Sequence, residues 1–206
     1  VYMIDLAGNT RRKIVAFPGI NSGAAISPDG RTMALTLSKD GNPDLYLIDV
    51  GSGAMTRLTQ TKHACEASPA WSPDGSQLVF ASDAAGVARP QLYSISRSGG
   101  QAKRLTFRGS ENVEPDWGPD GRIVFVRRWE GRYHLFLMNP DGSGEVQITQ
   151  DYTDHNDPSW APDGRHIVYA KTERYASTIY LLDTEGDPEV ALTKLSGSWY
   201  SPACTK

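Results

Sequence analysis

The tetrapeptide x-Pro-Asp-Gly occurs four times in this chain at nearly equal intervals. The copies are Ser27-Pro28-Asp29-Gly30, Ser72-Pro73-Asp74-Gly75, Gly118-Pro119-Asp120-Gly121 and Ala161-Pro162-Asp163-Gly164. They start at positions 27, 72, 118 and 161, so the intervals are 45, 46 and 43 residues. Pro presets φ at the first turn position, Asp suits the second, and Gly accepts the left-handed backbone that closes a bulged hairpin. Four copies in register predict four equivalent hairpins.

The residues around each turn predict four strands per repeat. The first strand ends in Pro69-Ala70-Trp71, Pro115-Asp116-Trp117 and Pro158-Ser159-Trp160, with Ala24-Ala25-Ile26 as a degenerate copy. The second strand, for example "LVFAS", is largely apolar on both faces, as expected for a strand between neighbouring sheets. The third carries one aromatic residue, and the fourth ends in threonine. Four strands in about 45 residues, without helical periodicity, are typical of a β-propeller blade.

The predicted fold is therefore all-β, a single β-propeller of four-stranded antiparallel blades over residues 1–206. The predicted full blades cover 24–59, 69–106, 115–149 and 158–193, and the ends form a partial blade at 1–17 and a terminal closing strand at 200–206. These pieces predict most of a six-bladed ring, with a five-bladed closure as the alternative. Because the chain starts inside a strand and without an initiator Met, we expect the natural protein to extend upstream.

Composition narrows the functional classes. The net charge is -3 and the Lys and Arg residues are scattered, which gives no electrostatic footprint for nucleic acid. No apolar run approaches the roughly 20 residues of a membrane helix, and the first residues lack the features of a signal peptide. The two cysteines, Cys65 and Cys204, form no CxxC pattern. We expect two independent thiols, although an oxidising compartment would allow a disulfide.

The whole chain resembles the TolB-like propellers of the PD40 repeat family, in particular the C-terminal propeller of the Tol–Pal system. The resemblance rests on the SPDG turns, the preceding "SPAW", the phrases "LTLSKDGNPDLYLIDVGSGAMTRLT" and "ASDAAGVARPQLYSISRSGGQAKRLTFRGSEN", and the terminal "SPA". The sequence departs from the family pattern at Ile26, where Trp is usual. It also departs at Cys204-Thr205-Lys206, where the family tends to have Trp-Ser-Pro.

This resemblance implies a non-enzymatic scaffold in the periplasm. Its propeller would bind a Pal-type peptidoglycan-associated lipoprotein, and an N-terminal domain outside this sequence would contact TolA. Such proteins support outer-membrane integrity and cell division, and colicins exploit the same face during import. The resemblance also leaves room for a calcium ion in the channel, but no D-x-D-x-D spacing marks one. We therefore expect no cofactor and no direct membrane insertion.

The topology predicts where a protein partner would bind. Because the Pro-Asp-Gly turns join strands one and two, two other sets of loops meet at the opposite end of the blades. These are the loops leading into each first strand and the loops joining strands two and three; we call this end the loop face, and the other the turn face. Protein-binding patches combine aromatic anchors with polar contacts. The candidate partner-binding residues are His63, Glu66, Asn112, Glu114, His155, Asn156, Asp157, Trp129 and Tyr200.

Alternative interpretations are weaker. Trp71, Trp117 and Trp160 could form a stacking platform, but their repetition at one blade position favours packing between blades. His63 and His155 could ligate a metal with Glu66 or Asp157, yet lone loop histidines are more often polar surface. A metal-dependent lyase acting on acidic sugars would need more histidines at the channel. A prolyl-oligopeptidase-like peptidase would carry a G-x-S-x-G motif, which this sequence lacks.

Overall fold

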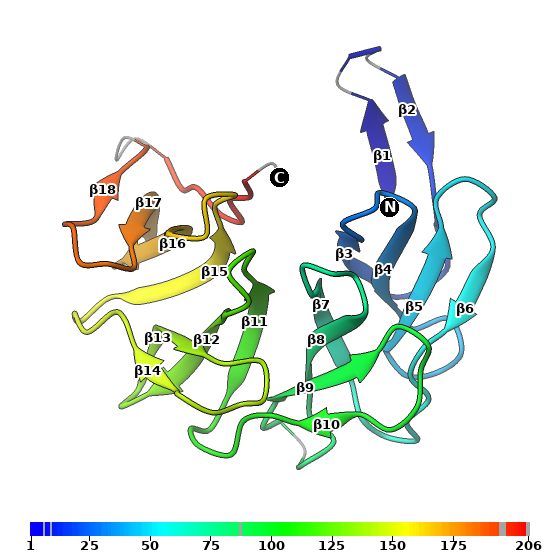
Figure 1. The fold of residues 1–206 in the computed structure, drawn as a ribbon, viewed down its shortest axis with the longest axis horizontal. Helices are drawn as coiled ribbons and strands as arrows, with labels where there is room; N and C mark the ends of the chain where they lie inside the picture. Colours follow the sequence, from blue (N-terminus) through cyan, green and yellow to red (C-terminus); the bar gives the residue numbers. More distant parts are fainter. Residues whose placement is uncertain (6, 9, 87, 194–196, 205–206) are drawn as a thin grey trace.

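Four antiparallel blades follow one another in an open arc (Figure 1). The computed structural model describes residues 1–5, 7–8, 10–86, 88–193 and 197–204. Blade one contains β3 (Asn21–Ile26), β4 (Thr32–Leu37), β5 (Asp44–Asp49) and β6 (Met55–Arg57), and blade two β7 (Glu66–Trp71), β8 (Gln77–Ser82), β9 (Gln91–Ser96) and β10 (Lys103–Arg104). Blade three contains β11 (Asn112–Trp117), β12 (Ile123–Trp129), β13 (Arg132–Met138) and β14 (Val146–Gln147), and blade four β15 (Asp154–Trp160), β16 (His166–Glu173), β17 (Ala176–Asp183) and β18 (Val190–Ala191). The described residues include no helix long and apolar enough to cross a membrane. The all-β propeller prediction is confirmed.

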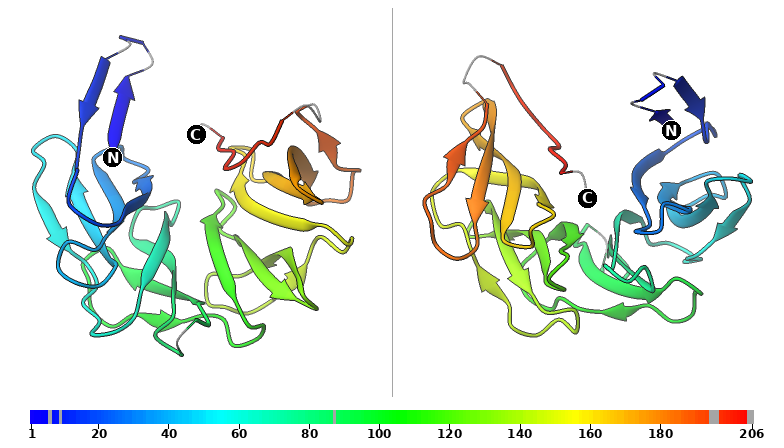
Figure 2. Two further views of the ribbon diagram at one scale, coloured as in Figure 1. Left: turned by 180° about the vertical axis from the view of Figure 1, so that it is seen from behind. Right: turned by 45° about the horizontal axis from the view of Figure 1, so that its top comes forward.

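The two ends of the chain do not form complete blades. Strands β1 (Tyr2–Asp5) and β2 (Thr10–Lys13) pair as a hairpin that projects from blade one in both views of Figure 2. At the other end, residues 197–204 have no strand assignment, although a closing strand was predicted over 200–206. In each complete blade the first strand pairs with the second strand of the same blade. No described segment occupies the second-strand position beside residues 200–204. Residues 205 and 206 are outside the described part of the chain.

The Pro-Asp-Gly turns form the hairpins that the sequence predicts. In the second copy the Gly75 N–H donates to the carbonyl of Ser72 at 2.8 Å, and Gly75 has a φ of 69°. The Asp74 carboxylate accepts the backbone N–H of Ser76 at 3.0 Å and the Ser72 hydroxyl at 2.6 Å. These hydrogen bonds hold the turn closed, which fixes the register between β7 and β8. The equivalent glycines of the other three turns also have positive φ.

The repeated tryptophans pack between blades. Trp71, Trp117 and Trp160 are 2–3% exposed, which confirms their assignment to the core. Trp71 packs with Ala34 and Leu45 of the preceding blade, and Trp160 with Val124 and Leu135 of blade three. Ile26 occupies the same position in blade one and is 43% exposed. Each tryptophan is covered by the blade that precedes it. The described segment before blade one contains only the β1–β2 hairpin, so Ile26 lacks that cover.

Buried polar pairs form a second repeated contact between blades. Each pair joins the start of a third strand to the start of the next blade's first strand. The pairs are Asp44 with Glu66, Gln91 with Asn112, and His134 with His155, and all six residues are at most 6% exposed. The Gln91–Asn112 pair is a direct hydrogen bond of 3.0 Å, and the two histidine rings stack with their centroids 5.6 Å apart. The same position therefore carries an acid pair, an amide pair and an imidazole pair.

The first strands begin earlier than the sequence suggests. They start at Glu66, Asn112 and Asp154, three to four residues before the predicted starts at Pro69, Pro115 and Pro158. Polar residues ahead of a proline resemble a loop, but here they pair with the second strand. As a consequence, three of the candidate partner-binding residues lie inside the blade junctions.

We expect Trp117→Ala to lower the free energy of unfolding by about 3–5 kcal/mol, because it removes a large buried side chain between two blades. Trp129→Ala is the matched control, since this side chain is already 39% exposed, and we expect it to cost less than about 1 kcal/mol. Urea denaturation followed by circular dichroism measures both. Equal losses for the two variants would contradict the packing role of the repeated tryptophan.

The acid pair makes stability depend on pH. Glu66 accepts hydrogen bonds from Thr59, Thr61 and Ser82, and it contacts Asp44. Burial raises the pKa of Glu66 to about 7, above its ordinary value of 4.5. The folded state therefore holds a proton that the unfolded state releases between these two values. This contribution to stability is complete below about pH 4.5 and is lost as the pH rises toward 7.

Glu66→Gln should remove that dependence, because the amide mimics the protonated acid. Relative to the original protein, we expect the variant to gain up to about 3 kcal/mol in free energy of unfolding between pH 4.5 and pH 8. Urea denaturation across this pH range provides the test, with Glu130→Gln at an exposed hairpin tip as the control. If the two stability curves stay parallel, Glu66 is ionised in the folded protein and the assignment fails.

Candidate functional site

Each first strand contains a β-bulge near the loop face. The pairing register shifts between Ser22 and Ala25 in β3, between Ala67 and Ala70 in β7, between Val113 and Asp116 in β11, and between Asn156 and Ser159 in β15. In each case three steps along the first strand oppose two steps along the second, so the first strand carries one extra residue. A bulge bends the strand and redirects a side chain. Four equivalent bulges redirect the backbone in the same way, and in three of them the redirected residue carries a side chain.

The bulged residues have left-handed backbone and surround the channel. Gly23, Ser68, Glu114 and Asp157 have φ values of 62°, 52°, 51° and 52°. Ser201 lies outside any assigned strand but has a similar φ of 49°. With the residues that follow them, they line one cavity of 220 Å³; the lining residues are Gly23, Ala24, Ser68, Pro69, Glu114, Pro115, Asp157, Pro158, Ser201 and Pro202. Proline has no N–H to donate, and a bulge is one of the few places in a sheet that tolerates it. We call this cavity the channel mouth.

Hydrogen bonds join neighbouring blades around the channel mouth. The Asp157 N–H donates to Glu114 Oε2 at 2.7 Å, and the Ser201 N–H donates to Asp157 Oδ2 at 3.0 Å. The Ser201 hydroxyl donates to the same Asp157 oxygen. Burial raises the pKa of Glu114, and the nearby Asp157 carboxylate acts in the same direction. The mouth therefore presents a partly desolvated acidic rim that is fixed by the backbone.

The candidate residues from the sequence divide into two groups. His63, Trp129 and Tyr200 are exposed, and Glu114, Asn156 and Asp157 are half-buried, so all six offer side chains at the surface. Glu66, Asn112 and His155 are buried in the blade junctions. Their side chains hold the loop face in place and are not available for direct contact in this conformation.

Asn112 and His155 show how tightly the junctions are built. Asn112 donates to the carbonyl of Arg108 at 2.8 Å and accepts from Arg127 at 2.6 Å. The His155 ring lies between the rings of His134 and Tyr169, at centroid distances of 5.6 and 5.5 Å. Burial lowers the pKa of His155, since charging the ring there would cost solvation. Both residues complete hydrophobic and polar packing between blades.

The described residues do not fit a metal ion. No group of three or more His, Cys, Asp and Glu side chains among them is arranged to hold one. The Glu114 and Asp157 carboxylates at the channel mouth each accept a backbone N–H. We therefore derive no role for calcium from this site. Cys65 and Cys204 are both free thiols in this structure.

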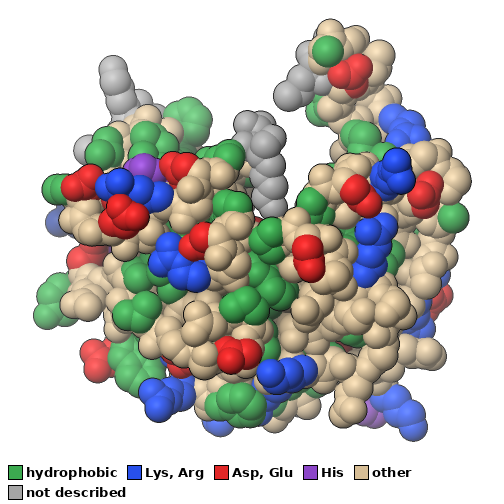
Figure 3. All heavy atoms as spheres, viewed as in Figure 1, with side chains coloured by type: hydrophobic (Ala, Val, Ile, Leu, Met, Phe, Trp, Pro, Cys, Tyr) green, Lys and Arg blue, Asp and Glu red, His purple; other side chains and the backbone are tan. Residues whose placement is uncertain are grey.

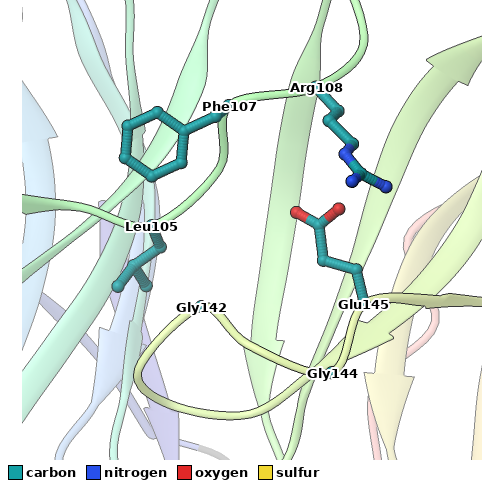
Figure 4. Close-up of a pocket in the computed structure, with 6 residues that line it drawn as sticks. All are labelled: Leu105, Phe107, Arg108, Gly142, Gly144 and Glu145. Atoms are coloured by element: carbon teal, nitrogen blue, oxygen red, sulfur yellow. The ribbon is translucent and has the colours of Figure 1, made fainter.

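A groove at the outer edge separates blades two and three. It has a volume of 380 Å³, and Figure 4 shows Phe107 on one side and Arg108 directed toward Glu145 on the other. A similar groove of 350 Å³ lies between blades three and four. The ion pairs beside the two grooves are also equivalent: Arg127 with Glu145 at 2.8 Å, and Lys171 with Glu189 at 2.5 Å. The repetition indicates that these grooves follow from blade packing.

The charge on the visible surface is mixed. In Figure 3 the Lys and Arg side chains alternate with Asp and Glu side chains, and neither sign forms a continuous patch on this face. This distribution agrees with the net charge of -3 and with the absence of a phosphate-binding footprint in the sequence.

Of the five left-handed residues at the channel mouth, the sequence predictions include Glu114 and Asp157 but not Gly23, Ser68 and Ser201. The sequence contained a signal for them. Ser68 and Ser201 each stand directly before a proline at the same place in the repeat, and Gly23 stands before Ala24 at the equivalent place in blade one. A proline inside a predicted strand indicates a bulge or an edge. The residue before it is then the one that the bulge turns toward the channel.

Comparisons with known proteins agree with this architecture. The TolB beta propeller domain model, PD40, matches residues 1–206. The Tol-Pal system protein TolB of Gluconobacter oxydans (strain 621H) is 36% identical over 154 residues, which cover 74% of this chain and 34% of that protein. The crystal structure of TolB from Acinetobacter baumannii superposes with a TM-score of 0.83 at 30% identity, covering 98% of this chain and 50% of that one.

One structural relative shares only the fold. An oligogalacturonate lyase in complex with manganese is 18% identical, with a TM-score of 0.67, and the match covers 93% of this chain and 58% of that one. This chain spans about a third of the length of the curated relatives that it matches. The family match extends over the whole chain, and the blade repeat carries it. The chain belongs to the TolB β-propeller family.

Proposed function

We propose that this propeller is a scaffold of the Tol–Pal system in the periplasm, and that its loop face binds a Pal-type lipoprotein. The observation that carries the proposal is the channel mouth, where bulged residues from successive first strands present a fixed polar rim. The TolB relatives supply the system to which such a face would belong. In this role the propeller acts by protein recognition and performs no catalysis.

The rim has the features of a protein-binding centre. Glu114 and Asp157 provide recessed acceptors whose positions are set by backbone hydrogen bonds, so little ordering is needed on binding. Tyr200 is 60% exposed and Trp129 is 39% exposed, and exposed aromatic residues are frequent anchors in interfaces. A partner segment that brings N–H donors or a cation into the mouth would complement the acidic rim.

The wider role follows from the family. The scaffold would support outer-membrane integrity and cell division, with TolA contacting an N-terminal domain outside this sequence, and colicins would use the same face. An enzymatic role has less support. The lyase relative shares the fold at 18% identity, and on the loop face the two histidines differ, His63 being exposed and His155 enclosed.

Calorimetric titration with the soluble domain of the same organism's Pal-type lipoprotein tests the proposal. We expect saturable binding to the propeller, weakened at least tenfold by Glu114→Lys, because the lysine reverses the charge of the rim. Asn156→Ala should weaken binding without a change of charge. Glu185→Lys is the charge-matched control on the turn face, where Glu185 is exposed, and should leave binding unchanged.

Two results would contradict the proposal. One is the absence of binding by the original protein when circular dichroism shows that it is folded. The other is an equal loss of affinity for Glu114→Lys and Glu185→Lys, which would place recognition outside the channel mouth. Since Asn156→Ala is a small truncation, it keeps the test valid if Glu114→Lys does not fold.

A further inference from the structure

A separate cavity lies at the outer part of the loop face on blade three. It has a volume of 310 Å³ and is bounded by the tip of the β12–β13 hairpin and by the loop that follows β14. The lining residues are Trp129, Glu130, Arg132, His134, Gln147, Gln150, Asp151 and Tyr152. Cavities of about 300 Å³ and larger hold small ligands in proteins. We call it the blade-three cavity, and none of its lining residues belongs to the channel mouth.

Two aromatic side chains stand at this cavity from different segments. Trp129 comes from the hairpin and is 39% exposed, and Tyr152 comes from the loop and is 92% exposed. An aromatic ring of this size left in water gives up the stabilisation that burial would bring. Two such rings beside one cavity provide apolar faces for a ligand that is itself partly apolar.

Two of the three charged side chains that line the cavity, Arg132 and Asp151, have ion-pair partners, and the third, Glu130, is exposed at the hairpin tip. Arg132 pairs with Asp154 at 3.5 Å, and Asp151 pairs with Lys171 at 2.6 Å. Neither charge is therefore free for an oppositely charged ligand. This pairing argues against a phosphate or a carboxylate as the principal group that the cavity recognises.

The cavity wall also contains neutral side chains that can form hydrogen bonds with a ligand. Gln147 uses its amide nitrogen to donate to the carbonyl of Thr149 at 2.7 Å, which leaves its amide oxygen as an acceptor. His134 is 6% exposed, and its Nδ1 is enclosed without a hydrogen-bond partner among the described residues. Gln150 adds a second amide to the wall.

Blade four provides an internal comparison. The equivalent groove there has a volume of 240 Å³ and is lined by Lys171, Glu173, Arg174, Ala176, Thr178 and Tyr180. Thr178 takes the place of His134, and Glu173 takes the place of Trp129. The fold therefore builds the groove in both blades. Tyr180 is the one aromatic side chain that lines the blade-four groove, and no amide side chain lines it among the described residues. The composition of the blade-three cavity is not required by the propeller itself.

We propose that the blade-three cavity binds a neutral pyranose unit of an oligosaccharide. A sugar ring offers apolar C–H faces to Trp129 and Tyr152 and several hydroxyl groups to the amides of Gln147 and Gln150. A hydroxyl both donates and accepts, so it suits an amide group regardless of which amide atom faces the cavity. The proposal does not depend on lipoprotein binding at the channel mouth.

Saturation-transfer NMR with three neutral tetrasaccharides tests the proposal: the β-1,4-linked N-acetylglucosamine, β-1,4-linked glucose and α-1,4-linked glucose oligomers. We expect at least one to bind saturably with a millimolar Kd. Trp129→Ala should weaken that binding at least tenfold, and Gln150→Leu at least threefold. Tyr175→Ala, at the tip of the equivalent hairpin of blade four and 97% exposed, should have no effect.

Three outcomes would overturn the proposal. The first is that none of the three oligosaccharides binds the folded protein. The second is that a bound oligosaccharide binds Trp129→Ala and Gln150→Leu as well as it binds the original protein. The third is that Tyr175→Ala loses binding to the same extent as Trp129→Ala, which would show general aromatic adhesion. Lipoprotein binding by Gln150→Leu, measured in parallel, distinguishes failure of this proposal from failure of the proposed function.

Discussion

One extra residue in each first strand determines how this propeller is built. The β-bulge places that residue in the left-handed region, with φ close to 50° at Ser68, Glu114 and Asp157, and Ser201 of the terminal segment has the same backbone conformation. For a residue other than glycine this conformation costs of order 1 kcal/mol or more, so the surroundings must hold it. They do so through the blade-to-blade hydrogen bonds that join Glu114, Asp157 and Ser201. The same bulges permit a proline in an inner strand and turn polar side chains toward the channel.

Packing between blades combines a constant apolar contact with a variable polar one. In blades two to four the tryptophan of the first strand packs against the preceding blade, whereas the polar pair at the loop end changes from acids to amides to imidazoles. Burial raises the pKa of Glu66 and lowers the pKa of His155, so the two junctions respond to pH in opposite directions. The acid junction loses stability as pH rises toward 7. The histidine junction is stable above its unfolded pKa of about 6.5 and loses stability as pH falls below it.

The repeat predicted much of this structure, because its turns and tryptophans act locally. A Pro-Asp-Gly turn needs only its own residues to close, and a tryptophan repeated at one position in each blade must be buried in the same way each time. The starts of the first strands depend on contacts with distant residues. Glu66, Asn112 and His155 precede a proline and are polar, which suggested loops, but Asp44, Gln91 and His134 of the preceding blades bury them. Those partners are about 21 to 22 residues away in the sequence, beyond the reach of a local pattern.

The central claim is that the bulges form the recognition site at the loop face. Hydrogen–deuterium exchange of the propeller, with and without the Pal-type lipoprotein domain, tests it most directly because exchange reports on every segment at once. The account expects slower exchange on binding at 61–68, 109–114, 151–157 and 197–201, and no change at the four Pro-Asp-Gly turns. Protection confined to those turns, or to the hairpin of β1 and β2, would contradict it.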